Sequence, residues 1–129
     1  MSRTIKILLV KLGLDVHNRG IITVAKILSN AGLEVIYLGN AFPKEIINVA
    51  IQEDVDIVGL SSLAGAHITL GREVIREAIK NQVKDKMKFV IGGVFPPTDA
   101  KTLINYGFDK VFLTDITSNE LVNNIKQLI

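Results

Sequence analysis

The chain has 129 residues, and 48% of them are hydrophobic, which is typical of one folded domain and excludes a disordered segment. Its 15 basic and 13 acidic residues leave a net charge of only +2, which argues against nucleic acid as the main partner. It contains no cysteine, so disulfides, thiolate metal sites and cysteine nucleophiles are all excluded.

Five short apolar runs, rich in β-branched residues, recur along the chain. Nearly continuous runs of this kind are typical of strands that are buried on both faces. The predicted strands are Ile5–Val10, Val35–Leu38, Ile57–Leu60, Phe89–Ile91 and Val111–Leu113. The first run is too short to span a membrane, and no signal-peptide cleavage region follows it. We therefore expect a cytoplasmic protein with no membrane partner.

Amphipathic helical patterns separate these runs. The apolar residues that share one face of each predicted helix are Ile21, Val24, Ala25 and Leu28; Ile46, Val49 and Ala50; Ile68, Ile75 and Ile79; Leu103; and Leu121, Ile125 and Leu128. Residues that favour helix boundaries agree with this pattern: Pro43 and Pro97 near two starts, Gly32 and Gly107 near two ends, and a Thr117–Glu120 capping box.

Regular alternation of strand and helix predicts a parallel sheet with helices on both faces. The fold class that we expect is α/β: a flavodoxin-like (Rossmann-like), doubly wound sheet of five strands in the order 2-1-3-4-5. In such a sheet, ligands bind at the carboxyl ends of the strands, where the strand order reverses. Function is therefore expected in segments 11–19, 61–67, 92–99 and 114–117.

The segment after the first strand contains the pair that is most suggestive of metal binding. Asp15 and His17 are two residues apart, so both side chains can lie on one side of an extended loop. A carboxylate that accepts the N–H of one ring nitrogen leaves the other nitrogen free for a metal. Lys11, at the end of the first strand, could pair with Asp15. A solvated loop with an incidental histidine is the alternative.

Small residues dominate the segments after the third and fourth strands. Residues 61–66 leave room against the backbone, and Gly92 with Gly93 admits close approach of a ligand. Close helix packing and a plain turn are the alternatives. We expect His67 to begin a helix in a surface or capping role rather than to bind metal. All these features meet at one edge of the predicted sheet.

Other functions of the same fold lack their signatures here. A response-regulator receiver needs an aspartate at the end of the third strand, where this chain has Ser61 and Ser62. The segment after the first strand is not a hydroxyl-rich phosphate loop of the flavodoxin kind. Neither a G-x-G-x-x-G motif nor a Walker loop is present.

Three motifs together resemble the cobalamin-binding domain of the adenosylcobalamin-dependent acyl-CoA mutases, the methylmalonyl-CoA mutase group. Residues 15–20 match D-x-H-x-x-G, residues 61–63 match S-x-L, and Gly92–Gly93 match the later G-G. They occur in the order and at the spacing of that family.

The resemblance implies that cobalamin binds base-off, with its dimethylbenzimidazole tail threaded into the domain. His17 would be the lower ligand of the cobalt, with Asp15 and Lys11 behind it as a hydrogen-bonded relay. The other cofactor-binding residues that the resemblance implies are Asn18, Arg19, Gly20, Ser61, Leu63, Gly92, Gly93 and Thr114. Ser61 would hydrogen-bond the tail base, Leu63 would line its slot, and the glycines would make room for it.

The segment after the fifth strand departs from the family. Residues 114–117 read T-D-I-T where many relatives have Gly-Pro-Gly-Thr, although small subunits of the 2-hydroxyisobutyryl-CoA mutase type are similar there. The chain has no catalytic residues of its own, so the resemblance implies a large (β/α)₈ catalytic subunit as partner. The expected substrates are methylmalonyl-CoA first and 2-hydroxyisobutyryl-CoA second. A corrinoid carrier or cobalamin-dependent sensor, or a cofactor-free interaction module, is the alternative.

Overall fold

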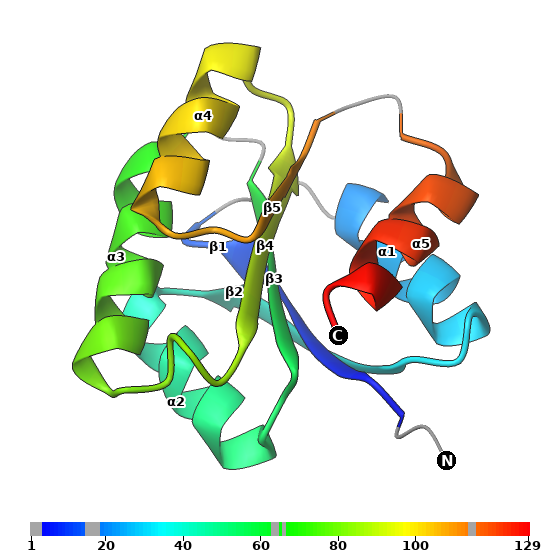
Figure 1. Cartoon of the computed structure of the whole chain (residues 1–129), viewed down its shortest axis with the longest axis horizontal. Helices are drawn as coiled ribbons and strands as arrows, with labels where there is room; N and C mark the ends of the chain where they lie inside the picture. Colours follow the sequence, from blue (N-terminus) through cyan, green and yellow to red (C-terminus); the bar gives the residue numbers. More distant parts are fainter. Residues whose placement is uncertain (1–3, 15–18, 63–64, 66, 114–115) are drawn as a thin grey trace.

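The computed structural model describes residues 4–14, 19–62, 65, 67–113 and 116–129 (Figure 1). Within these residues, five strands alternate with five helices. In chain order they are β1 (Lys6–Leu12), α1 (Arg19–Asn30), β2 (Glu34–Ala41), α2 (Pro43–Glu53), β3 (Ile57–Ser62), α3 (His67–Lys80), β4 (Lys88–Gly93), α4 (Pro97–Tyr106), β5 (Lys110–Phe112) and α5 (Ser118–Gln127).

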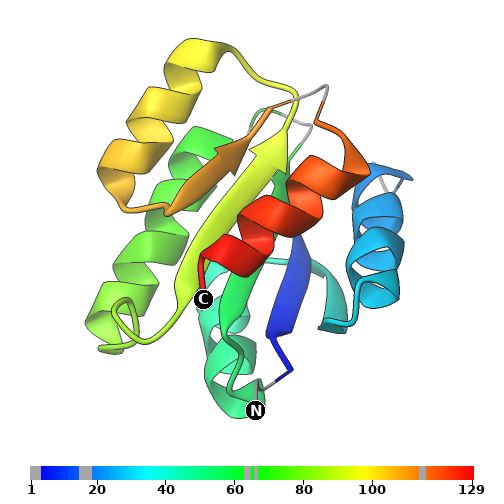
Figure 2. The ribbon, with the colours of Figure 1, turned by 45° about the vertical axis from the view of Figure 1, so that its right-hand side comes forward.

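The strands form one parallel sheet in the order β2-β1-β3-β4-β5, which confirms the predicted topology. Helices α1 and α5 cover one face of the sheet, and α2, α3 and α4 cover the other (Figures 1 and 2). Since β1 and β3 are central, side chains at their carboxyl ends are flanked by further strands on both sides. This edge is the one at which the sequence predicts function.

Alternation along the strands divides the buried side chains between the two faces. Leu8 and Val10 of β1 join the larger core beneath α2, α3 and α4, where Phe89 is a large, fully buried side chain. Ile7 and Leu9 join the smaller core beneath α1 and α5. Each face of the sheet is thus apolar, which explains why the strand sequences are nearly continuous hydrophobic runs.

Two aspartates fix the register at the amino-terminal edge of the sheet. The Asp56 carboxylate accepts the backbone N–H of Lys6 at 2.9 Å, and the Asp109 carboxylate accepts that of Phe89 at 2.8 Å. Each aspartate also donates its own backbone N–H to the carbonyl of the same partner. These reciprocal bonds align β3 with β1 and β5 with β4, one residue before each strand begins.

The helix boundaries confirm the sequence signals. Pro43 and Pro97 are the first residues of α2 and α4, and Gly107 ends α4 with a φ of 125°. At the start of α5, the Thr117 side chain accepts the backbone N–H of Glu120 at 3.1 Å, and the Glu120 side chain accepts that of Thr117 at 3.2 Å. The predicted capping box is therefore formed.

Two details of the sequence interpretation were wrong. Strands β1 to β4 continue further toward their carboxyl ends than predicted, and Lys11, Ser61 and Gly92, for example, still pair in register with their neighbours, whereas β5 ends one residue earlier, at Phe112. These residues belong to β1, β3 and β4 rather than to loops. Ile79 is 59% exposed, because the buried face of α3 passes through Ala78 instead.

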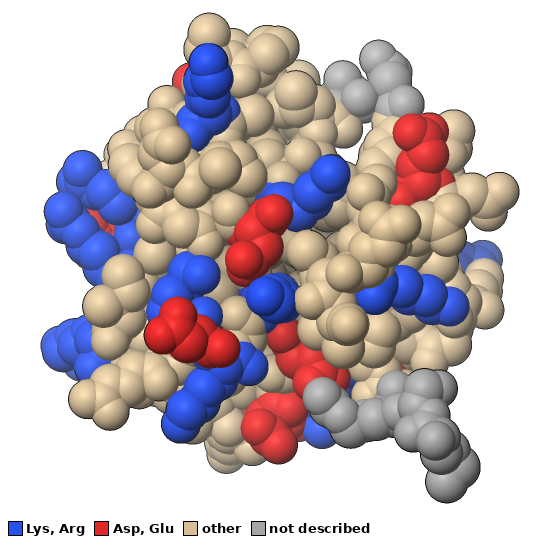
Figure 3. Space-filling view, in the orientation of Figure 1, with Lys and Arg blue, Asp and Glu red and all other residues tan. Residues whose placement is uncertain are grey.

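The surface in Figure 3 mixes charges of both signs. Lysine and arginine side chains alternate with aspartate and glutamate over this face and do not gather into one basic patch. Among the residues that the structure describes, no helix has the length and hydropathy needed to cross a membrane.

Candidate functional site

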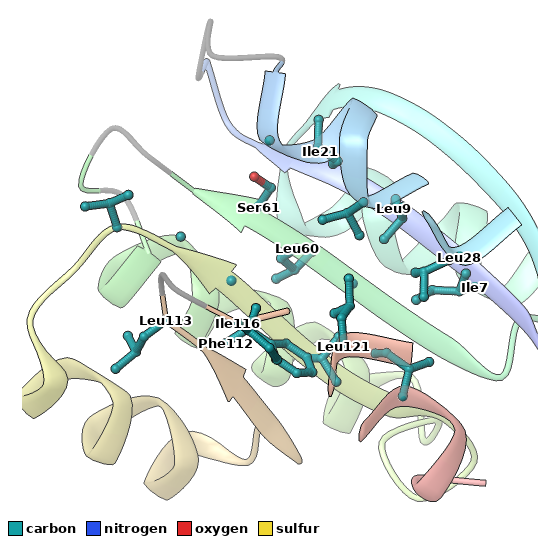
Figure 4. Close-up of a pocket in the computed structure, with 18 residues that line it drawn as sticks. Ile7, Leu9, Ile21, Leu28, Leu60, Ser61, Phe112, Leu113, Ile116 and Leu121 are labelled. Carbon is teal, nitrogen blue, oxygen red and sulfur yellow. The ribbon is translucent and has the colours of Figure 1, made fainter. Parts of the chain in front are cut away.

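A cavity of about 350 Å³ lies between the sheet and the two helices α1 and α5 (Figure 4). It extends from the carboxyl ends of the strands down toward the middle of the sheet. This volume lies within the range of pockets that hold small molecules. The lining residues come from four strands, two helices and the segments after β4 and before α5: Ile7, Leu9, Gly20, Ile21, Val24, Leu28, Gly59, Leu60, Ser61, Val90, Gly92, Gly93, Val94, Phe112, Leu113, Ile116, Leu121 and Ile125.

Small residues on β3 and β4 form the floor of the cavity. Gly59 and Ser61 are two residues apart on β3, so both face α1 and α5, and Ser61 is in register with Gly92 of β4. A Cβ atom added to Gly92 would approach no atom more closely than 3.5 Å, with Phe112 as its nearest neighbour. An added Cβ would therefore make only ordinary van der Waals contact with Phe112, and a larger side chain would extend into the cavity that Gly92 lines.

Gly93 has a different role from Gly92. A Cβ atom on Gly93 would lie 2.0 Å from the backbone oxygen of Ser62 on the neighbouring strand. Real atoms do not approach so closely, so this position requires glycine for the packing of β4 against β3. The paired glycines thus serve two purposes, one for the cavity and one for the sheet itself.

The walls of the cavity are almost entirely apolar. Ser61 is the one polar side chain among the described residues that line it, and its oxygen stands out in Figure 4. The side chains around it are aliphatic, apart from the Phe112 ring. Burying a polar group without a partner is unfavourable, so this cavity suits an apolar, uncharged group with one hydrogen-bonding atom.

The structure brings together several of the residues that the sequence predicts. Gly20, Ser61, Gly92 and Gly93 all line the cavity. Lys11 lies near the end of β1, in register with Ser61, and is only 5% exposed. Lys11 is not without an interaction partner in the protein. The predicted residues Asp15, His17, Asn18, Leu63 and Thr114, and the side chain of Arg19, lie outside the described residues.

His67 does not have the predicted surface or capping role, although it does begin α3. It is only 6% exposed, and its Nε2 donates a hydrogen bond of 2.8 Å to the Asp99 carboxylate. Its ring stacks on Phe95, with centroids 4.4 Å apart and an angle of 17° between the planes. Asp99 and Phe95 both follow α3 in the sequence, and their contacts offset the cost of burying the imidazole. In the part of the chain described, no three metal-ligating side chains gather.

Sequence reasoning missed Gly59 and most of the apolar wall. Gly59 interrupts the β-branched run of β3, and a glycine inside a strand indicates close approach of another group. That signal was available. Phe112 and Ile116 carry no comparable signal, because an apolar residue that lines a cavity has the same sequence pattern as one that fills a core.

The chain was compared with known proteins. The family model described as "B12 binding domain" matches residues 5–120. The chain is 37% identical to the 2-hydroxyisobutanoyl-CoA mutase small subunit of Aquincola tertiaricarbonis, over 97% of this chain and 92% of that protein. It is 33% identical to the pivalyl-CoA mutase small subunit of Xanthobacter autotrophicus, over 98% of this chain and 85% of that protein. A cobalamin-binding protein from Desulfitobacterium hafniense has the same fold, with a TM-score of 0.82 and 22% identity over 97% of this chain and 59% of that one.

Proposed function

The chain belongs to the B12-binding domain family, and from this premise we propose that residues 1–129 form one domain that holds cobalamin base-off, with the nucleotide tail in the cavity. The proposal rests on one observation: residues of the family motifs are also residues that line the cavity. Gly20, Ser61, Gly92 and Gly93, which belong to the family motifs, also line the cavity between the sheet and helices α1 and α5.

The cavity fits the chemistry of the tail base. A dimethylbenzimidazole is flat and apolar, and once it is released from cobalt it has one ring nitrogen free to accept a hydrogen bond. Ser61 offers one hydroxyl to such an acceptor, and the part of the cavity that Gly92 lines accepts the ring. Apolar side chains of α1 and α5, such as Ile21 and Leu121, contact the other side of the ring.

His17 is our candidate for the lower ligand of the cobalt. The chain has two histidines and no cysteine, so few side chains could replace the tail base at the metal. His67 is buried and its Nε2 is already bonded to Asp99, which leaves His17. In this proposal Asp15 accepts the second N–H of the His17 ring, Lys11 supports Asp15, and Asn18, Arg19, Leu63 and Thr114 contact the cofactor.

We further propose that the chain is the small subunit of an acyl-CoA mutase, an isomerase that uses adenosylcobalamin. When bound, the cofactor supplies a cobalt–carbon bond whose homolysis begins radical chemistry. This chain's own residues bind, orient and shield the cofactor, and a large (β/α)₈ subunit provides the substrate site. The similarity to two mutase small subunits along nearly their whole lengths supports this assignment. A cytoplasmic location remains a prediction from the sequence.

The substrate that we favour is a branched acyl-CoA. The sequence motifs alone rank methylmalonyl-CoA before 2-hydroxyisobutyryl-CoA. The 37% identity to a 2-hydroxyisobutanoyl-CoA mutase small subunit favours the second, and it accords with the T-D-I-T sequence at 114–117. The residues that select the substrate belong to the large subunit, so both compounds must be assayed.

Spectroscopy of the cobalt tests the binding proposal. The chain is titrated with hydroxocobalamin, reduced to the Co(II) form, and examined by electron spin resonance. With ¹⁵N-labelled protein, we expect hyperfine coupling to one ¹⁵N nucleus of the chain in the wild type and in the surface control Ile79→Ala. We expect none in His17→Ala, where any remaining nitrogen coupling would come from the unlabelled tail base. Equal spectra for wild type and His17→Ala would contradict the assignment of His17.

Affinity capture tests the partner. The tagged chain should recover a large mutase subunit, and the pair should rearrange one of the two acyl-CoA substrates when adenosylcobalamin is added. Recovery of a methyltransferase or a transcriptional regulator instead would favour the corrinoid carrier or the sensor.

A further inference from the structure

A connected group of residues lies on the opposite face of the sheet, directly behind the mouth of the cavity. We call it the edge cluster; its members are Ser62, His67, Gly93, Phe95 and Asp99. Asp99, in the first turn of α4, accepts the 2.8 Å hydrogen bond from His67, the first residue of α3. The Phe95 ring stacks on His67. It also lies so close to Gly93 that a Cβ atom added to this glycine would be 3.0 Å from the edge of the ring. The cluster thus links two strand ends to two helix starts.

The edge cluster and the cavity share the same strand ends. Consecutive strand residues face opposite sides of a sheet, so Ser61 and Gly92 face the cavity while Ser62 and Gly93 face the cluster. Gly93 has no space to move toward β3, because Ser62 lies directly against it. A shift of Ser62 or Gly93 would therefore displace the floor of the cavity. In addition, only residues 63–66 separate Ser62 from His67, so both ends of that segment belong to the cluster.

Stability alone does not explain the polar atoms of the edge cluster. Ser62 Oγ and His67 Nδ1 are buried, and neither has a hydrogen-bond partner among the described residues. Because a carboxylate oxygen accepts hydrogen bonds, the His67 Nε2–H donates to Asp99, and no described residue lies within hydrogen-bonding reach of the buried Nδ1. Buried polar atoms without partners are rare in folded proteins and call for an explanation. Apolar side chains of similar shape would avoid the loss of hydration.

We propose that His67 is a positioning residue of the cofactor site. By bonding Asp99 and stacking on Phe95, it holds the ends of β3 and β4 at the separation that the cofactor tail requires. It acts from behind the sheet and does not contact the tail or the cobalt. This inference rests on the proposed function, because it assigns His67 to the site that we propose for cobalamin.

Substitutions on both sides of the His67–Asp99 bond test the inference. His67→Ala and Asp99→Ala should each weaken hydroxocobalamin binding about 3- to 30-fold, the usual effect of losing one buried hydrogen bond and its geometry. The double variant should be no weaker than the weaker single variant, because both remove the same link. Asp99→Asn should bind within about threefold of wild type, because its amide oxygen still accepts the Nε2 proton.

Controls separate positioning from simple loss of stability. Glu73→Ala removes an exposed 3.0 Å hydrogen bond to Arg76 on the same helix and should leave cobalamin binding unchanged. Circular dichroism at the titration temperature gives the folded fraction of each variant. If His67→Ala does not fold, the pair Asp99→Ala and Asp99→Asn decides, because the Asp99 side chain is 29% exposed and its loss leaves the buried ring in place.

The electron spin resonance spectrum provides the second measurement. A positioning role predicts that Asp99→Ala lowers the fraction of cobalt showing histidine nitrogen coupling, whereas Asp99→Asn retains it. Folded His67→Ala and Asp99→Ala variants that bind as tightly as wild type would overturn the inference and leave the proposed function intact. A wild-type chain that does not bind hydroxocobalamin would overturn the proposed function, and the inference with it.

Discussion

The two adjacent glycines at the end of β4 should respond in opposite ways to a larger side chain. Gly92→Val places its branches in the cavity, and its first added carbon makes only ordinary contact with Phe112, at 3.5 Å. Neither glycine has a positive φ, and valine is favoured in strands, so Gly92→Val should fold with a stability within about 1 kcal/mol of wild type. Gly93→Ala adds a carbon 2.0 Å from the backbone oxygen of Ser62 and should lower the free energy of unfolding by about 3 kcal/mol or more.

Cobalamin binding should show the reverse order. The Gly92→Val side chain competes with the tail for the same space, and overpacking of about 1–3 kcal/mol corresponds to a loss of affinity of about 5- to 150-fold. Urea unfolding gives the two stabilities, and absorption titration with hydroxocobalamin gives the affinities of the folded proteins. Wild-type affinity in Gly92→Val would refute the placement of the tail above Gly92. Wild-type stability in Gly93→Ala would refute the claim that the sheet itself requires this glycine.

Three other outcomes are expected. His17→Ala should abolish histidine nitrogen coupling in the Co(II) spectrum while leaving the unfolding midpoint unchanged. In direct competition, a cobamide with an adenine tail should bind about 5- to 150-fold more weakly than the benzimidazole form. Ser61 is the one polar side chain among the described residues that line the cavity, so the amine of a buried adenine would lack a hydrogen-bond partner. Thr117→Ala should lower the free energy of unfolding by about 1 kcal/mol in urea, because it removes the side-chain half of the α5 capping box; an unchanged midpoint would show that the cap contributes nothing.

The sequence predicts the fold well because each level of the pattern points the same way. β-branched runs mark strands that are buried on both faces, and the prolines, glycines and capping box mark the helix boundaries between them. Ile79 shows where periodicity fails. The sequence of α3 is compatible with more than one rotation of the helix about its own axis, and each rotation would bury a different set of apolar residues. In the packing of α3 against the sheet, Ala78 is buried and Ile79 is exposed.

The candidate site was predicted in part. Ser61 and the Gly92–Gly93 pair stand out because small or polar residues at the end of a buried strand are unusual. The separate roles of the two glycines depend on which face each one takes, and that follows only from the strand register. The burial of His67 depends on Phe95 and Asp99, which lie about thirty residues further along the chain. Local sequence around His67 contains no sign of either contact.

The walls of the cavity come from both ends of the chain. Leu9 and Ile21 belong to the first strand and the first helix, whereas Leu121 and Ile125 belong to the last helix. During synthesis the slot cannot exist until α5 has left the ribosome and docked beside α1. Cofactor loading would therefore follow the docking of α5. A ligand held in the slot would also oppose fraying of α5, so that the cofactor would protect this helix from proteases.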